Sequence, residues 1–472
     1  MLLRDDAIAI WSAGLAAVDS AKSVMQQVGI LQDQLWIAGV RIPMPPDGRI
    51  EVVGAGKAGA GMASGIEAAL SSTDFADRVS GWVNVPADCL RPLRHIHLHA
   101  ARPAGLNEPT PDAVQGTQEI LRRVQSLSKS DVCIVLLSGG ASALLCSPAP
   151  GISLSDKLSV TRALAGIGAP IHELNLVRTQ LSQVKGGRLA EACSAGTLVA
   201  LIISDVVGDP LEVIGSGPTT PGVSRAADGL QVLRDRDVLD RIPPRVIAFL
   251  ERQADAARTM DTDAEFPRAC TVVNRIVASN AMAIDAAAVK AKALGYEVQS
   301  LGSANAGEAA EEGRRLIDRL LAIPAESVGT PQQTIQDHQR RVCILSGGEP
   351  TVNLSVSGTA SGIPAAHSVA AARGGRNQEL VLAAVASHRN SADWKGTVLL
   401  SAGTDGEDGP TDAAGAIVDE AVVARIAASG LNPDSYLARH ESYPFFDAVD
   451  GLFKTGPTHT NVMDLRVGLR FL

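Results

Sequence analysis

The sequence has few aromatic residues, and it lacks paired cysteine motifs and long apolar runs. Phe, Trp and Tyr make up 3% of its 472 residues, which argues against the aromatic platforms on which nucleic-acid bases stack. None of its six cysteines forms a Cys-x-x-Cys pair, which excludes the usual zinc and thioredoxin-like motifs. A disulfide scaffold is not expected in a chain of this length, so a reducing, cytoplasmic location is predicted. No apolar run reaches the roughly 20 residues of a membrane-spanning helix.

Acidic residues outnumber basic residues in the chain. The formal net charge is −9, which argues against nucleic acid or an anionic membrane as a partner. Asp5 and Asp6 lie where a signal peptide would carry basic residues, so no leader is expected. Hydrophobic residues make up 46% and charged residues 20%, which is typical of a globular chain with two or three domains.

Apolar strand-like runs alternate with helical stretches, which predicts an α/β fold with a largely parallel sheet. Two polar segments, residues 259–267 and 322–340, interrupt the pattern. We expect an N-terminal domain over residues 1–260, a C-terminal domain over 261–472 and an exposed insertion at 322–340. The predicted strands cover residues 50–53, 81–85, 132–137, 198–204, 270–274, 342–346 and 398–401; the predicted helices cover 112–125, 225–239, 278–294, 308–321 and 378–386.

The first of these strands ends in a Gly-x-Gly-x-x-Gly sequence, residues 54–59. Such a turn presents backbone N–H groups at a helix N-terminus, where an anion is favoured. Lys57 within the turn points to an oxygen-rich, charged ligand. A dinucleotide site would need an acidic residue at the end of the second strand, whereas residues 82–86 contain none. A tight strand-to-helix turn without a ligand is the alternative.

A second glycine-rich turn, residues 137–145, follows the strand at 132–137. Its glycines allow a ligand to approach the backbone, and its serines add hydroxyl groups, as in a phosphate loop. A serine nucleophile is the rival interpretation, but no Gly-x-Ser-x-Gly elbow is present. The predicted nucleotide-binding residues are Ser138, Gly139, Gly140 and Ser142.

Carboxylates follow three further strands. Residues 403–415 combine three aspartates and a glutamate with four glycines, which favours a cation or polyoxygen ligand over a solvated turn. Asp205 directly follows an apolar run, where a metal or a basic partner would compensate its burial; a helix cap is the alternative. The candidate metal ligands are Asp205, Glu349, Asp405 and Asp408.

Basic residues beside glycine pairs are the candidates for binding carboxylate or phosphate. They are Arg178, Lys185, Arg188, Arg373 and Arg376. Arg376 is the strongest candidate because the two preceding glycines would let the backbone approach a ligand. Strand ends with serines, glycines, carboxylates and bases together suit phosphoryl transfer, which needs positioning, a divalent cation and positive charge.

This set of motifs resembles the glycerate 2-kinase (MOFRL) family, some members of which carry the name hydroxypyruvate reductase. The matching segments lie in order at residues 54–63, 137–145, 177–190, 204–219, 346–349, 374–380, 403–416 and 455–465. The resemblance implies ATP- and Mg²⁺-dependent phosphorylation of D-glycerate to 2-phosphoglycerate. It also implies a Rossmann-like domain and a smaller C-terminal α/β domain, with the active site in the cleft between them.

The resemblance assigns the family's active-site lysine and arginine to Lys57 and Arg376. We expect Asp205 to join them as a catalytic residue, and Arg188 and Asn377 to join them in binding substrate. The expected partners are glycerate and ATP, with a homodimer as one compatible assembly. A nicotinamide-dependent hydroxypyruvate reductase and a non-catalytic phosphometabolite-binding protein are the alternatives. The chain departs from the family pattern at Arg102, Thr179, Gln180 and His459, which leaves the hydroxy acid open.

Overall fold

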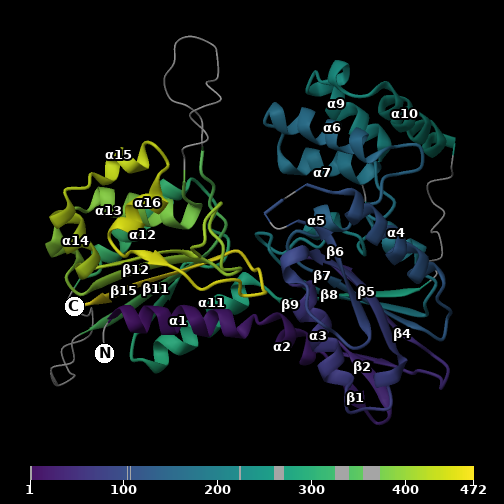
Figure 1. The fold of residues 1–472 in the computed structure, drawn as a ribbon, viewed down its shortest axis with the longest axis horizontal. Coiled ribbons are helices and arrows are strands. Elements are labelled where there is room, and N and C mark those ends of the chain that lie inside the picture. Colours follow the sequence, from purple (N-terminus) through teal and green to yellow (C-terminus); the bar gives the residue numbers. More distant parts are fainter. Residues whose placement is uncertain are drawn as a thin grey trace. The chain divides into compact units, whose positions relative to one another are not determined.

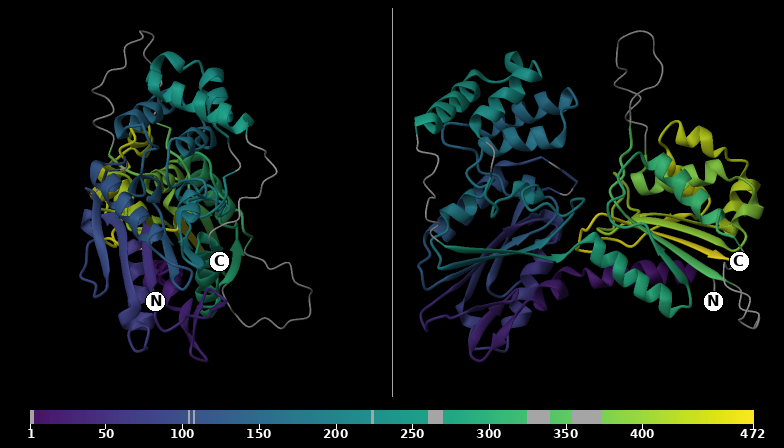
Figure 2. Two further views of the ribbon diagram at one scale, coloured as in Figure 1. Left: turned by 90° about the vertical axis from the view of Figure 1, so that its right-hand side faces the viewer. Right: turned by 180° about the vertical axis from the view of Figure 1, so that it is seen from behind.

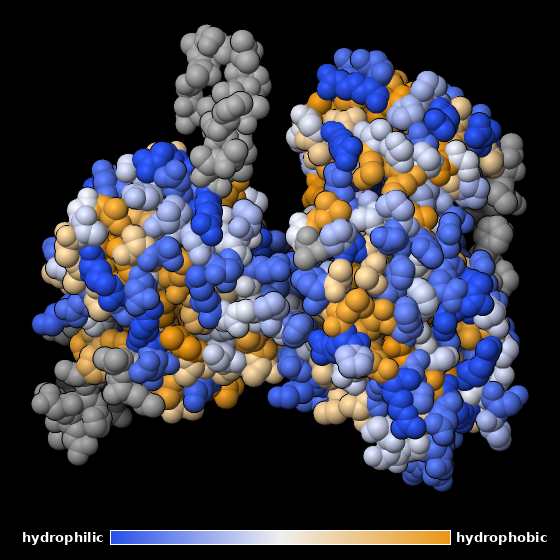
Figure 3. Space-filling model, viewed as in Figure 1, coloured by the Kyte–Doolittle hydropathy of each residue, from blue (hydrophilic) through white to orange (hydrophobic). Residues whose placement is uncertain are grey.

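The computed structural model describes residues 3–103, 105–106, 108–222, 225–259, 270–324, 340–353 and 373–472. The chain divides into two compact units, drawn in Figure 1. Unit 1 comprises residues 1–18 and 278–472, and unit 2 comprises residues 19–277. Within the described ranges, no helix combines the length and apolarity that crossing a membrane requires. On the face shown in Figure 3, hydrophilic and hydrophobic residues are interspersed over both units.

Unit 2 is built on a six-stranded sheet with the order β6-β5-β4-β7-β8-β9. Strands β6, β5, β4, β7 and β8 pair in parallel, and this order is that of the doubly wound dinucleotide-binding folds. The strand order reverses between β4 and β7, which is where such sheets bind ligands. The strands are β4 (Ile50–Ala55), β5 (Val79–Pro86), β6 (Ile96–Arg102), β7 (Val132–Leu137), β8 (Thr197–Ile203) and β9 (Thr271–Ala278).

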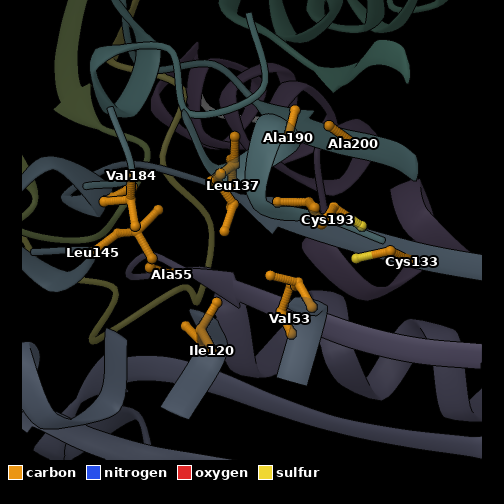
Figure 4. Close-up of a cluster of buried hydrophobic side chains, with 14 of the residues drawn as sticks. Val53, Ala55, Ile120, Cys133, Leu137, Leu145, Val184, Ala190, Cys193 and Ala200 are labelled. Carbon is orange, nitrogen blue, oxygen red and sulfur yellow. The ribbon is translucent and has the colours of Figure 1, made fainter. Parts of the chain in front are cut away.

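The central strands β4 and β7 are buried at every residue, because helices cover both faces of the sheet. Helices α3 (Gly59–Leu70) and α4 (Pro111–Gln125) lie on its opposite sides in Figure 1. Figure 4 shows the core on the α4 side, where Val53 and Leu137 from the strands gather with Ile120 from α4. The remaining short elements are α2 (Ser20–Met25), α5 (Ala141–Leu144), α8 (Arg188–Ala192) and an antiparallel meander of β1 (Val28–Leu31), β2 (Gln34–Ile37) and β3 (Val40–Ile42).

A helical part of unit 2 has its own apolar core. Leu164 of α6, Val177 of α7 and Leu233 of α9 are buried in it. Its helices lie together at the top of unit 2 in Figure 1. They are α6 (Leu154–Gly166), α7 (Ile171–Gln180), α9 (Ala226–Asp235) and α10 (Pro244–Thr259).

Unit 1 contains a second six-stranded sheet, of order β10-β11-β15-β12-β13-β14. Only β10 and β11 pair in parallel, so the predicted parallel arrangement holds for unit 2 and is wrong for this sheet. The reason is β15, which was not predicted and which runs antiparallel between β11 and β12. The strands are β10 (Glu297–Ser300), β11 (Arg341–Gly348), β12 (Thr397–Gly403), β13 (Gly415–Asp419), β14 (Leu452–Phe453) and β15 (Asp464–Phe471).

Helices cover both faces of the unit 1 sheet, as the rear view in Figure 2 also shows. Helices α1 (Leu3–Ala17) and α11 (Asn280–Ala293) share one core with the sheet, and α12 (Ala309–Leu321) and α13 (Arg376–Ser387) share the other. The unit is completed by α14 (Glu420–Ser429), α15 (Pro433–Leu437) and α16 (Ser442–Ala448).

The compact units are bounded differently from the predicted division at residue 260. Helix α1 belongs with the C-terminal part because its buried Ala7, Ile10 and Trp11 pack in one core with α11 and the unit 1 sheet. At the other junction, β9 carries unit 2 on to residue 277. Most of the predicted insertion at 322–340 lies outside the described residues.

Candidate functional site

The loops that follow β4 and β7 interlock where the strand order of the unit 2 sheet reverses. The backbone N–H of Lys57 donates to the carbonyl of Gly139 at 2.8 Å, and that of Ala58 donates to Oγ of Ser138 at 3.1 Å. Gly56 has a φ of +148°, and a Cβ there would lie 2.0 Å from Oγ of Ser138. Glycine is therefore required at position 56, because any side chain would push the two loops apart.

This interlocking places basic side chains around Gly140. A Cβ at Gly140 would lie 3.4 Å from Nη2 of Arg102 and 3.7 Å from Cγ of Lys57. Arg102 ends β6, and Lys57 is half-buried just before the N-terminus of α3. Two cations beside a helix N-terminus favour the binding of an anion. The buried hydroxyl of Ser138 accepts the Ala58 N–H and holds the loops together, and its role in binding nucleotide stays a prediction.

Asp205 lies at the same edge of the sheet. The parallel register places Ala55 beside Leu137, and Leu137 beside Ile202, so the loops after β4, β7 and β8 leave the sheet at one end. Asp205 follows β8 by two residues and is half-buried. The structure thus brings the predicted residues Lys57 and Asp205 to one edge of unit 2.

Lys185 connects this edge to the segment that follows β8. Its Nζ donates to the carbonyls of Ser142 and Gly215, at 3.1 and 3.2 Å, and to Oγ of Ser216 at 3.3 Å. The hydroxyls of Ser142 and Ser216 lie 3.2 Å apart. Arg188 is tied down nearby, because its Nη1 donates to the Lys185 carbonyl at 3.3 Å. The two predicted anion-binding residues are therefore held by neutral oxygens.

In unit 1, Arg376 begins α13 and is held by two carboxylates. Its Nε and Nη2 donate to the two oxygens of Asp464, at 2.7 and 2.9 Å, and its Nη1 lies 3.1 Å from Oε1 of Glu349. Burial lowers the pKa of Arg376, but both acidic partners raise it, and the net result is a pKa above the ordinary value. Asp464 is fully buried, whereas the Glu349 side chain is 44% exposed. An incoming anion can therefore compete for Arg376 only with Glu349.

Asp408 caps the same helix. One of its oxygens accepts the backbone N–H of Asn377 at 3.0 Å and the Asn377 side-chain amide at 3.2 Å, and the other accepts the N–H of Gln378 at 2.8 Å. Asn377 is fully buried and also accepts the Ser401 hydroxyl at 2.6 Å. Burial raises the pKa of Asp408 to about 7, against these hydrogen bonds. Both side chains belong to the interior of unit 1.

The chain matches two families over most of its length. Residues 6–251 match a domain of unknown function (DUF4147), and residues 342–464 match the MOFRL family. Glycerate kinase of Homo sapiens is 36% identical over 460 residues, which cover 88% of this chain and 83% of the human protein. The chain belongs to the MOFRL glycerate kinase family. The resemblance seen in the motifs is thereby confirmed.

Solved structures support the fold of this family member. A glycerate kinase from Thermotoga maritima has a TM-score of 0.76 and 30% identity, over 99% of each chain. The α/β fold class, with its doubly wound sheet and second α/β region, is confirmed. A protein of Agrobacterium vitis named putative hydroxypyruvate reductase is 38% identical over 422 residues, which cover 89% of this chain and 98% of that protein. The family thus carries two functional names.

The predicted metal ligands divide between the units, with Asp205 in unit 2 and Glu349, Asp405 and Asp408 in unit 1. In the parts of the chain that the structure describes, no three His, Cys, Asp or Glu side chains gather as the ligands of one metal ion would. Both oxygens of Asp408 are used in capping α13. Glu349 lies against Arg376, and Oδ1 of Asp405 accepts the N–H of Glu407 at 3.1 Å. Asp205 and Asp405 are half-buried, and the role of all four residues as metal ligands stays a prediction.

Asn377 also lies in the buried interior of unit 1, and its role in binding substrate stays a prediction. Asn377, predicted to bind substrate, has its amide and its carbonyl oxygen engaged by Asp408 and Ser401. The predicted residues divide between the units. Lys57, Ser138, Gly139, Gly140, Ser142, Arg188 and Asp205 belong to unit 2, and Glu349, Arg376, Asn377, Asp405 and Asp408 belong to unit 1.

Two buried polar residues were not among the predicted site residues. Asp464 begins the unpredicted β15, and the only signal for it was its place in the last matching motif, residues 455–465. Lys157 is buried in α6, a helix that was not predicted. Neither residue could be distinguished from a surface charge without the fold.

Proposed function

We propose that this protein transfers the γ-phosphoryl group of ATP to the 2-hydroxyl of D-glycerate, with 2-phosphoglycerate and ADP as products. The observation that carries the proposal is the pair of interlocked loops in unit 2, which presents Lys57 beside Gly140 and Arg102. Phosphoryl transfer requires positioned positive charge and backbone donors at the phosphates. The glycerate kinases among its relatives support the same reaction class.

Lys57 has the central role in the proposed reaction. Its backbone N–H is held by the Gly139 carbonyl, and the residue is half-buried at the start of the loop. A cation at this position stabilises the negative charge that develops on the transferring phosphoryl oxygens. Arg102, on the other side of Gly140, adds a second positive charge.

Asp205 is the carboxylate we assign to magnesium. Mg²⁺ in kinases is usually bound through one or two carboxylates together with substrate phosphates, so a single half-buried aspartate at the sheet edge fits that ligand chemistry. When bound, the ion would neutralise phosphate charge. Asp205 is equally placed to orient the attacking hydroxyl, and the Mg²⁺ dependence of an Asp205→Asn variant separates the two roles.

Arg376 is the residue we assign to the carboxylate of the acid substrate. Its Nη1 faces the partly exposed Glu349, while buried Asp464 fixes the opposite edge of the guanidinium. A substrate carboxylate would replace Glu349 as the partner of Nη1. The arrangement keeps the arginine charged and oriented before substrate arrives.

A reductase is the second candidate, because relatives carry that name and the strand order suits a dinucleotide. The residue near the end of β5, where a ribose-binding acid is expected, is Asn84. Its side chain is fully buried, donates to the Leu144 carbonyl at 2.9 Å and accepts the Trp82 indole N–H at 3.2 Å. It therefore cannot meet a ribose hydroxyl without disrupting the core.

ADP release separates the two functions. Purified protein receives Mg-ATP with D-glycerate, with no acceptor and with a panel of other hydroxy acids, and a parallel arm receives NADH with hydroxypyruvate. We expect ADP release that depends on D-glycerate and no oxidation of NADH. Oxidation of NADH without ADP release would support the reductase. ADP release only with another hydroxy acid would identify that acid as the substrate in place of D-glycerate.

A further inference from the structure

Four basic side chains gather beside the helical part of unit 2. Lys157 comes from α6, Arg178 from the last turn of α7, Lys185 from the following segment and Arg188 from the start of α8. Lys157 and Lys185 are only 5% and 1% exposed. Lysines are almost never buried to this extent without a partner.

Hydrogen bonds hold two of the four side chains in place, those of Lys185 and Arg188. Nη1 of Arg188 donates to the carbonyl of Thr179 at 2.6 Å, which ties α8 to the residue next to Arg178. Nζ of Lys185 is held by three neutral oxygens, one of them the carbonyl of Ser142. Nζ of Lys157 is buried and has no hydrogen-bond partner among the described residues.

The four cations have little acidic compensation. Among the described residues, no carboxylate lies within ion-pair distance of any of them, and neighbouring Asp156 is turned to the hydroxyl of Ser153 and to Arg245. Burial lowers the pKa of Arg188, and Glu191 opposes this effect without forming an ion pair. Burial lowers the pKa of Lys157, and Arg178 and Arg188 lower it further although Cys146 opposes them. Buried charges of one sign that lack counter-charges are costly. A bound anion would remove that cost.

We propose that Lys157, Arg178, Lys185 and Arg188 form a buried anion site for the phosphoryl group of a ligand. The anion site follows from the cluster itself, while the choice of a phosphoryl group rests on the proposed function. A phosphoryl group suits four cations better than a carboxylate, because it carries more negative charge and three acceptor oxygens. The phosphoryl group belongs either to the nucleotide or to the phosphorylated acid, and binding of ADP and of 2-phosphoglycerate distinguishes the two.

Binding to Lys157→Met in the full-length protein tests the site. Dissociation constants are measured by calorimetry for inorganic phosphate, ADP, 2-phosphoglycerate and D-glycerate. Lys129→Met, which removes an exposed lysine of the same unit, is the matched control. Loss of a charge-assisted contact is expected to weaken binding of inorganic phosphate about tenfold or more, with D-glycerate unchanged. A parallel loss for ADP assigns the site to the nucleotide, and one for 2-phosphoglycerate assigns it to the acid.

Thermal unfolding separates an anion site from a structural role. An uncompensated buried cation does not stabilise the free protein, so Lys157→Met is expected to keep or raise the wild-type Tm without phosphate. The phosphate concentration needed to raise the Tm by a given amount should be about tenfold higher for the variant than for the wild type. If Lys157→Met does not fold, Arg178→Met is measured in the same way.

Unchanged phosphate affinity in the folded variant would overturn the anion site, whatever the turnover. A lower Tm of Lys157→Met together with an undiminished Tm rise with phosphate would also overturn it, because the lysine would then be structural. Absence of ADP release with any acid would refute the proposed function but leave the phosphate result standing. The two proposals therefore fail separately.

Discussion

Replacing Asp408 by alanine distinguishes a helix cap from a metal ligand. The carboxylate accepts the N–H groups of Asn377 and Gln378 at 3.0 and 2.8 Å, and it is 2% exposed. Its removal leaves two buried backbone donors without an acceptor. Each such donor costs about 1–3 kcal/mol, so the expected loss in the free energy of unfolding is about 2–6 kcal/mol.

The size of this loss should depend on pH. Burial raises the pKa of Asp408 from 3.8 to about 7, which the hydrogen bonds from Asn377 and Gln378 oppose. Between these values the native state holds a proton that the unfolded state has released, so wild-type stability falls as pH rises, by about 1.4 kcal/mol per pH unit. Asp408→Ala lacks this slope. The difference between wild type and variant is therefore largest near pH 4 and smallest above pH 7.

Urea unfolding at pH 5 and pH 8 measures both effects. Asp405→Ala is the control, since Asp405 lies in the same loop and is only half-buried; its loss should be small at both pH values. The Mg²⁺ concentration that supports half-maximal ADP release should be unchanged in Asp408→Ala if the variant remains folded. Wild-type stability of Asp408→Ala combined with a raised Mg²⁺ requirement would refute the cap and restore the metal ligand.

Three further predictions concern the interlocked loops and Arg376. Lys57→Ala should abolish ADP release while its far-ultraviolet circular dichroism and Tm stay near wild type; activity near wild type would remove Lys57 from the mechanism. In urea unfolding, Gly56→Ala should lower the free energy of unfolding by about 2–5 kcal/mol, because of backbone strain at positive φ and overpacking. Gly140→Ala should lower it by about 1–2 kcal/mol from strain alone, since a Cβ there meets nothing closer than 3.4 Å. Equal losses would show that the loops do not interlock. Asp464→Asn breaks a buried pair with Arg376 and should cost about 3 kcal/mol in the same assay, the low end of the range because Arg376 is partly exposed; an unaffected midpoint would contradict that pairing.

Three strands of the unit 2 sheet, β4, β7 and β8, could be predicted closely because they are apolar almost throughout. Strand β6 was not predicted, because His97 and His99 interrupt its apolar residues. The strand at residues 132–137 was predicted with the bounds of β7. Strands β4 and β8 were placed to within two residues at each end. When both faces of a parallel sheet are buried, its strands are apolar at nearly every position, and such runs are easily recognised in a sequence.

Unit 1 was harder to predict because its central strand contains buried charges. In β15, Asp464 and Arg466 are fully buried, and Arg466 donates to the Ser346 hydroxyl at 3.2 Å. Such pairing across strands cannot be seen in one segment of sequence. The missed strand reversed the expected parallel arrangement and hid the partner that orients Arg376.

The candidate site was predicted in part for a related reason. Lys57 was singled out because a lysine within a glycine-rich turn is unusual chemistry at a helix start, and its catalytic role stays a prediction. Asp408 was predicted as a metal ligand, although a carboxylate in a glycine-rich loop has the same local sequence whether it caps a helix or binds a metal. Lys157 could not be recognised from the sequence, because its burial depends on the packing of α6 against α7, which no local sequence pattern shows.

The central claim is transfer of a phosphoryl group to the 2-hydroxyl of D-glycerate. The most direct measurement is the ³¹P NMR spectrum of the product that the purified protein forms from Mg-ATP and D-glycerate. The account predicts the resonance of 2-phosphoglycerate together with stoichiometric ADP. A product phosphorylated at the 3-hydroxyl, or ATP that remains intact beside D-glycerate, would contradict it.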